Sequence, residues 1–104
     1  MKILISTGYG AGWSTWNDEN KDVARYILTY QPIIEALERG EGVGGNSTLV
    51  IQMCKECLEK FGYNSIYCGG VRNLCVKDVE PPFKINEYDG FESVQYFGGE
   101  EWYM

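Results

Sequence analysis

Four cysteines are the residues of this sequence whose spacing could hold a metal ion. They are Cys54, Cys57, Cys68 and Cys75, and four thiolates of this kind can surround a zinc ion tetrahedrally. The first two lie inside a stretch of helical periodicity, where free cysteine packs as a small apolar residue. A thioredoxin-type redox site needs its first cysteine at a helix N-terminus, and Cys54 lies about two turns further in. We therefore predict that the thiols belong to the core and that no cofactor is bound, with structural zinc as the alternative.

A glycine-rich loop after the first expected strand could bind an anion. Gly8, Gly10 and Gly12 alternate with other residues, and bare backbone amides in such loops can bind phosphate. The dinucleotide fingerprint, however, needs a further glycine at the position of Trp13 and a helix that begins inside the motif. A plain turn is therefore the favoured interpretation. The alternative is a nucleotide site in which the three glycines bind the phosphate and Trp13 or Trp16 stacks on the base.

The same loop carries three large aromatic residues. Tyr9, Trp13 and Trp16 are interleaved with glycine, serine and threonine, a composition typical of loops that recognise other proteins. Large aromatics also serve as core residues, so the sequence equally allows one indole ring to be buried and the other exposed. We predict an outward-facing recognition surface over residues 7–17, with no reactive group behind it.

Acidic residues are concentrated at the C-terminal end of the chain. The formal net charge is −6, and residues 1–77 contribute none of it, because eight acidic and eight basic residues balance there. From residue 78 onward, seven acidic residues accompany a single lysine. Such a field repels nucleic acid, whose binding needs a basic face, and it favours a basic partner. A solvated acidic face that keeps the protein soluble is the simpler alternative.

Three carboxylates surround an expected turn at Asp89 and Gly90. Glu87, Asp89 and Glu92 could form an acid pair or a divalent-ion site. The turn preference of Asp-Gly explains that pair without a ligand, and charges at a strand edge prevent edge-to-edge aggregation. We therefore interpret the three carboxylates as a solvated edge that contributes to recognition.

The sequence lacks histidine and shows no recognisable catalytic motif. Histidine is absent, which excludes Ser/His and Cys/His catalysis and removes the commonest metal ligand. P-loop, zincin and EF-hand patterns are also absent. We therefore predict a non-enzymatic protein that binds a partner protein. The partner is expected to be a basic, nucleic-acid-binding protein rather than nucleic acid itself. A homodimer is also compatible with the sequence. The predicted contact residues are Tyr9, Trp13, Trp16, Glu87, Asp89, Glu92, Glu100, Glu101 and Trp102.

The apolar pattern and the turn signals predict a single α+β domain over residues 1–104. Strands are expected over 2–6, 64–68, 71–79, 83–88 and 91–97, and helices over about 18–30, 32–39 and 47–61. The last helix has the strongest periodicity and ends at Gly62. Turns are expected at Gly69–Gly70 and Asp89–Gly90. Together these elements predict a mainly antiparallel sheet of about five strands with two or three helices on one face, followed by a flexible tail over 98–104.

Apolar runs in the sequence are short. The N-terminus has three consecutive apolar residues, whereas a signal peptide needs about 7 to 15. No run approaches the roughly 20 residues that span a bilayer. We therefore expect a cytoplasmic protein without membrane association.

Two segments resemble parts of small bacteriophage proteins. They are residues 2–16, KILISTGYGAGWSTW, and residues 82–92, PFKINEYDGFE. The resemblance implies a virus-encoded accessory protein that acts in the cytoplasm of a bacterial host. Such proteins often bind and block a host enzyme or an anti-phage defence factor, so the resemblance implies an inhibitor that acts by protein–protein contact.

Overall fold

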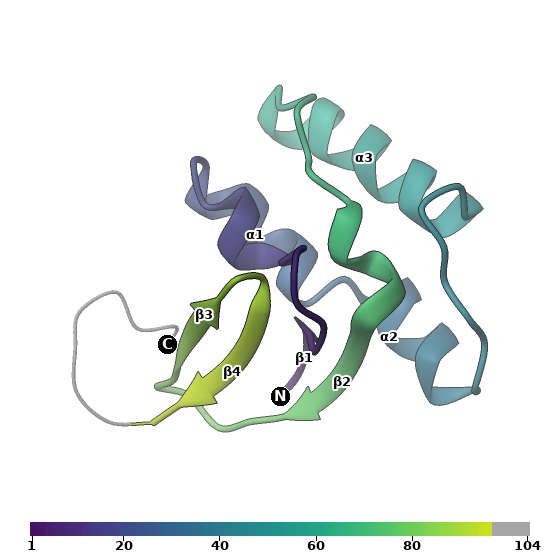
Figure 1. Cartoon of the computed structure of the whole chain (residues 1–104). Helices are drawn as coiled ribbons and strands as arrows, with labels where there is room; N and C mark the ends of the chain where they lie inside the picture. Colours follow the sequence, from purple (N-terminus) through teal and green to yellow (C-terminus); the bar gives the residue numbers. More distant parts are fainter. Residues whose placement is uncertain (97–104) are drawn as a thin grey trace.

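The computed structural model of the chain describes residues 1–96. The expected tail over 98–104 lies outside these residues, together with Glu100, Glu101 and Trp102. The described part forms three α-helices, four β-strands and two short 3-10 helices (Figure 1). In chain order the elements are β1 (Lys2–Ser6), η1 (Ser14–Asn17), α1 (Lys21–Leu28), α2 (Gln31–Glu38), α3 (Thr48–Phe61), η2 (Gly69–Asn73), β2 (Leu74–Asp78), β3 (Lys84–Tyr88) and β4 (Phe91–Gln95).

Strand β1 lies between the two hydrophobic cores of the protein. It pairs with β2 in antiparallel register, with Ile5 opposite Cys75. Leu4 belongs to the core formed with the helices, whereas Ile3 and Ile5 pack in a second core that includes Ile85 of β3. Both faces of β1 are therefore covered, which explains its run of consecutive apolar residues.

The three helices begin and end at residues suited to these positions. The Asn20 side chain caps α1 by accepting the backbone N–H groups of the first turn. Pro32 lies in the first turn of α2. Ser47 caps α3, and Gly62 ends it in the left-handed conformation, as the sequence predicts. No helix within residues 1–96 has the length and apolar character needed to cross a lipid bilayer.

The β3–β4 hairpin turns at Asp89 and Gly90, as the sequence predicts. Their φ angles are 49° and 88°, the two positive values of a type I′ turn. Tyr88 lies opposite Phe91, and Glu87 lies opposite Glu92. Because side chains alternate between the faces of a strand, the two aromatic residues share the outer face and the two glutamates share the inner face.

The prediction of one sheet of about five strands is wrong, although the α+β class with antiparallel strands is confirmed. Within residues 1–96 the strands form two separate two-stranded sheets, β1–β2 and β3–β4. Residues 69–73 form a 3-10 helix rather than a hairpin turn, and β2 pairs with β1 rather than with residues 64–68. Gly70 allows the 3-10 helix over 69–73 to lie close to the backbone of Gly12, since a Cβ at position 70 would lie 2.8 Å from the carbonyl carbon of Gly12.

Candidate functional site

Glu92 is buried beneath the predicted recognition loop. It is 1% exposed, and its carboxylate accepts the backbone N–H groups of Ser6 at 2.8 Å, Trp13 at 2.9 Å and Thr15 at 3.1 Å. The Thr15 hydroxyl donates a further hydrogen bond to the same carboxylate. The expectation that Glu92 contacts a partner is therefore wrong, because this side chain joins the hairpin to β1 and to the loop.

Trp13 is a core residue. It is 0% exposed, and its indole Nε1 donates a hydrogen bond of 3.1 Å to the carbonyl oxygen of Ile27 in α1. Neither partner contact nor stacking on a base is possible for a ring that is fully enclosed, so both expectations for Trp13 are wrong. Trp16, in contrast, is 38% exposed. One indole of the loop is thus buried and the other reaches the surface.

The glycine-rich loop is packed tightly against its neighbours. Gly10 has a φ of 90°, and its N–H donates to the carbonyl oxygen of Asp89. Gly12 is buried, and a Cβ at that position would lie 2.8 Å from Cγ of Trp16. Backbone amides on both sides of the loop bind the Glu92 carboxylate. The Asp89 carbonyl oxygen therefore occupies one donor that the nucleotide alternative needs, the N–H of Gly10, and the buried Gly12 is withdrawn from a ligand.

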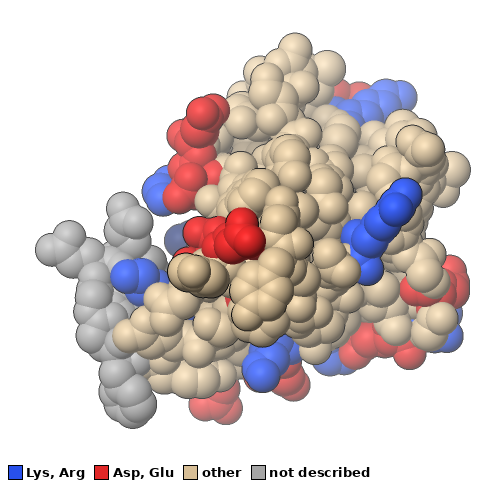
Figure 2. Space-filling model, in the orientation of Figure 1, with Lys and Arg blue, Asp and Glu red and all other residues tan. Residues whose placement is uncertain are grey.

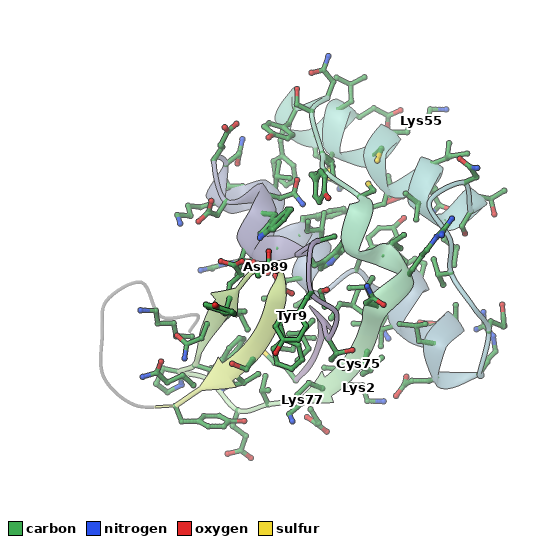
Figure 3. The ribbon with its side chains drawn as sticks, viewed as in Figure 1. Lys2, Tyr9, Lys55, Cys75, Lys77 and Asp89 are labelled. Carbon is green, nitrogen blue, oxygen red and sulfur yellow. The ribbon has the colours of Figure 1, made fainter. Side chains whose placement is uncertain are left out.

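The four cysteines are divided between the two cores. Cys54, Cys57 and Cys68 belong to or border the helical core, whereas Cys75 packs against the core beside the hairpin. Figure 3 shows Cys75 on β2, away from α3. Among residues 1–96, no group of three or more cysteine, aspartate or glutamate side chains is arranged to hold a metal ion. The zinc alternative therefore lacks the convergence of four thiols that it requires.

Three aromatic side chains form a cluster on the outer face of the hairpin, which we call the outer aromatic cluster: Tyr9, Tyr88 and Phe91. The Tyr9 ring stacks on Phe91 with 5.3 Å between centroids and 25° between planes. Tyr88 lies opposite Phe91 in the hairpin register. Tyr9 and Tyr88 are 68% and 78% exposed, and Figure 3 shows Tyr9 beside β4. Most of the surface of both tyrosines therefore faces solvent.

Trp16 forms a second aromatic contact near the hairpin tip. Its ring centroid lies 5.2 Å from that of Tyr67, and its Nε1 donates a hydrogen bond of 3.0 Å to the Glu87 carboxylate. The same carboxylate accepts the backbone N–H of Gly90 at 2.6 Å. These hydrogen bonds, that of Trp16 above all, lower the pKa of Glu87 because they stabilise its charged form. Trp16 and Glu87 are thereby held in one orientation at the surface.

The hairpin tip presents negative charge beside these aromatic rings. Glu87 and Asp89 are both exposed, and residues 78–96 contain five acidic residues and one lysine. Figure 3 labels Asp89 at the tip, and Figure 2 shows an acidic spot at the corresponding place, next to uncharged residues. Exposed aromatic side chains and a negatively charged hairpin tip are therefore both available to a partner.

Sequence reasoning missed several residues that build this surface. Tyr67, Tyr88 and Phe91 were not expected in it, although alternation on either side of the turn marks the last two as outward-facing. The buried Asn17 side chain exchanges two hydrogen bonds, of 2.8 and 2.7 Å, with the backbone of Tyr67. No local signal in the sequence marks this long-range role.

The fold and the site define an α+β domain with a hairpin whose tip combines exposed aromatic and acidic side chains. Comparisons with known protein families, with curated proteins and with solved structures find no match.

Proposed function

We propose that this protein is a non-enzymatic binding protein that docks on a basic region of a partner protein through the tip of the β3–β4 hairpin. The observation that carries the proposal is the exposure of Tyr9 and Tyr88 on a hairpin whose tip also carries the exposed carboxylates of Glu87 and Asp89. The proposed contact residues are Tyr9, Trp16, Tyr67, Glu87, Tyr88, Asp89 and Phe91.

Exposed tyrosine and tryptophan side chains are effective contact residues because they bury a large area with few rotatable bonds. In this protein several of them are held in place before a partner arrives. Tyr9 is stacked on Phe91, and Trp16 is fixed by its contacts with Tyr67 and Glu87. A pre-organised surface loses less conformational entropy on binding, which supports affinity.

Charge supports the choice of a basic partner. Glu87 and Asp89 lie at the tip, and complementary charge accelerates encounter more than it adds affinity. The hydrogen bonds that lower the pKa of Glu87 keep this carboxylate charged in mildly acidic solution. On the resemblance to bacteriophage proteins, the partner would be a bacterial host or defence protein whose basic surface is blocked.

Affinity capture from bacterial lysate tests this proposal with four immobilised proteins. The wild type is compared with Tyr9→Ser and Tyr88→Ser, which shorten exposed rings, and with the matched control Ile51→Ser. Ile51 is 60% exposed on α3, which Figure 1 shows on the opposite side of the molecule from the hairpin. We expect the wild type and Ile51→Ser to capture the same protein in stoichiometric and equal amounts. Each tyrosine variant should bind this protein about 10- to 100-fold more weakly.

The charge part of the proposal has its own variant. Asp89→Asn removes a negative charge, and asparagine tolerates the positive φ of this position. We expect slower association with the captured partner and a weaker dependence on salt than in the wild type. Failure to capture any stoichiometric protein, or equal capture by all four proteins, would contradict the proposal.

A further inference from the structure

The thiols of Cys54 and Cys68 meet between α3 and the segment that follows it. Their Sγ atoms lie 3.9 Å apart, although the two residues are 14 positions apart in the chain. The Cys68 thiol also donates a weak hydrogen bond to the carbonyl oxygen of Ile66, at 4.0 Å. Both cysteines are half-buried, so neither residue is fully enclosed in the core. No sequence pattern marks this pairing, which joins the first cysteine of the CxxC pair to a residue outside it.

We propose that Cys54 and Cys68 are a redox-active thiol pair that oxidised glutathione converts into an intramolecular disulfide. In the first step the Cys54 thiolate attacks one sulfur of oxidised glutathione, and the other sulfur leaves as glutathione thiolate. In the second step the Cys68 sulfur, having lost its proton, attacks Cys54 Sγ and releases the second glutathione. Two protein thiols are oxidised to one disulfide, and one molecule of oxidised glutathione is reduced to two of glutathione.

The surroundings of the thiols determine the order of these steps. Burial raises the pKa of the Cys68 thiol to about 12, so at neutral pH it is protonated and a poor first nucleophile. Burial likewise raises the pKa of Cys57 to about 11, and Cys57 is fully enclosed in the helical core. Cys54 therefore reacts first, and Cys68 reacts once the mixed disulfide at Cys54 is next to it.

The geometry also favours closure of this particular bond. A disulfide needs its sulfur atoms about 2.0 Å apart, so the pair has to close by roughly 2 Å, which rotation of two side chains and a small shift of the segment after Gly62 can supply. The bond would tie the middle of α3 to that segment and restrict the unfolded chain. We expect it to raise the thermal unfolding midpoint by several degrees.

Peptide mapping of the whole protein tests the pairing directly. Trypsin cleavage after Arg39, Lys55, Lys60, Arg72 and Lys77 places each of the four cysteines in a different peptide. The protein is incubated with excess oxidised glutathione, free thiols are alkylated at acidic pH, and the digest is analysed without reduction. We expect peptide 40–55 linked to peptide 61–72, with the loss of two hydrogen atoms.

Two variants make the test specific. Cys75→Ser changes a cysteine of the other core and is expected to leave both the linked peptides and the rise in midpoint unchanged. Cys68→Ser is expected to abolish both and to trap glutathione on Cys54. A wild-type protein that stays reduced, that links Cys54 to Cys57, or that forms only intermolecular disulfides would overturn the proposal.

Discussion

The Glu92 carboxylate accepts the backbone N–H of Trp13 at 2.9 Å, across 79 positions of the chain. A second oxygen of the same side chain accepts the N–H of Ser6 at the end of β1. Strand β1 pairs with β2 along one edge. On the side that faces the hairpin, β1 has no strand partner within residues 1–96, and its Ser6 N–H donates to the Glu92 carboxylate instead. Glu92 therefore joins the hairpin to the residues on both sides of the loop over residues 7–12.

Replacement of Glu92 by glutamine should destabilise the protein strongly. The carboxylate faces backbone and hydroxyl donors only, so the amide NH2 of glutamine would meet another donor in a buried position. We expect a loss of about 2–4 kcal/mol in the free energy of unfolding, measured in urea.

Glu87→Gln is the matched control for this variant. Glu87 lies opposite Glu92 in the hairpin register but is exposed. Water can therefore solvate the new amide group, and we expect a loss below about 1 kcal/mol. Equal losses in the two variants would show that Glu92 has no special role in joining the loop to the hairpin.

Local patterns predicted the elements of this fold better than their assembly. The terminal glycine of α3 and the Asp89–Gly90 turn depend on neighbouring residues, and the structure confirms both. The pairing of β1 with β2 depends on contacts between distant residues. The Gly69–Gly70 pair also serves close packing in the structure, a use that local turn preference cannot distinguish from a hairpin turn.

The two tryptophans of the loop should contribute very differently to stability. Trp13→Ala removes a fully enclosed ring and its hydrogen bond to the Ile27 carbonyl, and we expect a loss of about 3–5 kcal/mol. Trp16→Ala removes an exposed ring that contacts Tyr67, and about 1–2 kcal/mol is expected. Unfolding followed by far-ultraviolet circular dichroism measures both. A larger loss for Trp16→Ala would contradict the burial described here.

The candidate surface was predictable only in part, and these tryptophans show why. Aromatic residues in a glycine-rich loop indicate either recognition or core packing, and composition cannot assign the role of each ring. Glu92 carried a clearer signal, because alternation along β4 puts it on the same face as the partly buried Val94. Because carboxylates usually face solvent, the sequence instead predicted Glu92 on a solvated edge.

Gly90→Ala should disrupt the contact between the hairpin and the loop. Gly90 has a φ of 88°, and a Cβ there would lie 2.9 Å from Cα of Ala11. Backbone strain and steric overlap act together, so we expect a loss of about 2–4 kcal/mol in the free energy of unfolding. Gly45→Ala is the control, because a Cβ at position 45 meets nothing within 4 Å. Its unfolding free energy in urea should stay within about 1 kcal/mol of the wild type, and a similar loss in both variants would contradict the close packing at Gly90.

The tyrosine pair of the helical core should make stability sensitive to alkaline pH. The hydroxyl groups of Tyr26 and Tyr30 both donate to the Glu56 carboxylate. Burial first, and then this carboxylate, raise the pKa of Tyr26 to about 12 and that of Tyr30 as well. A raised pKa means that the folded state holds the proton more tightly, so its stabilisation is complete below the unfolded value near 10 and is lost as the pH rises towards 12.

Urea unfolding at pH 9 and at pH 11.5 measures this loss. Tyr26→Phe removes one of the two titrating hydroxyls, and we expect its stability to fall less between the two pH values than that of the wild type. Tyr88→Phe removes an exposed hydroxyl on the outer face of the hairpin, so its pH dependence should match the wild type. If Tyr26→Phe loses as much stability as the wild type, the alkaline sensitivity comes from other groups, and the Tyr26–Glu56 contact does not couple folding to the tyrosine proton.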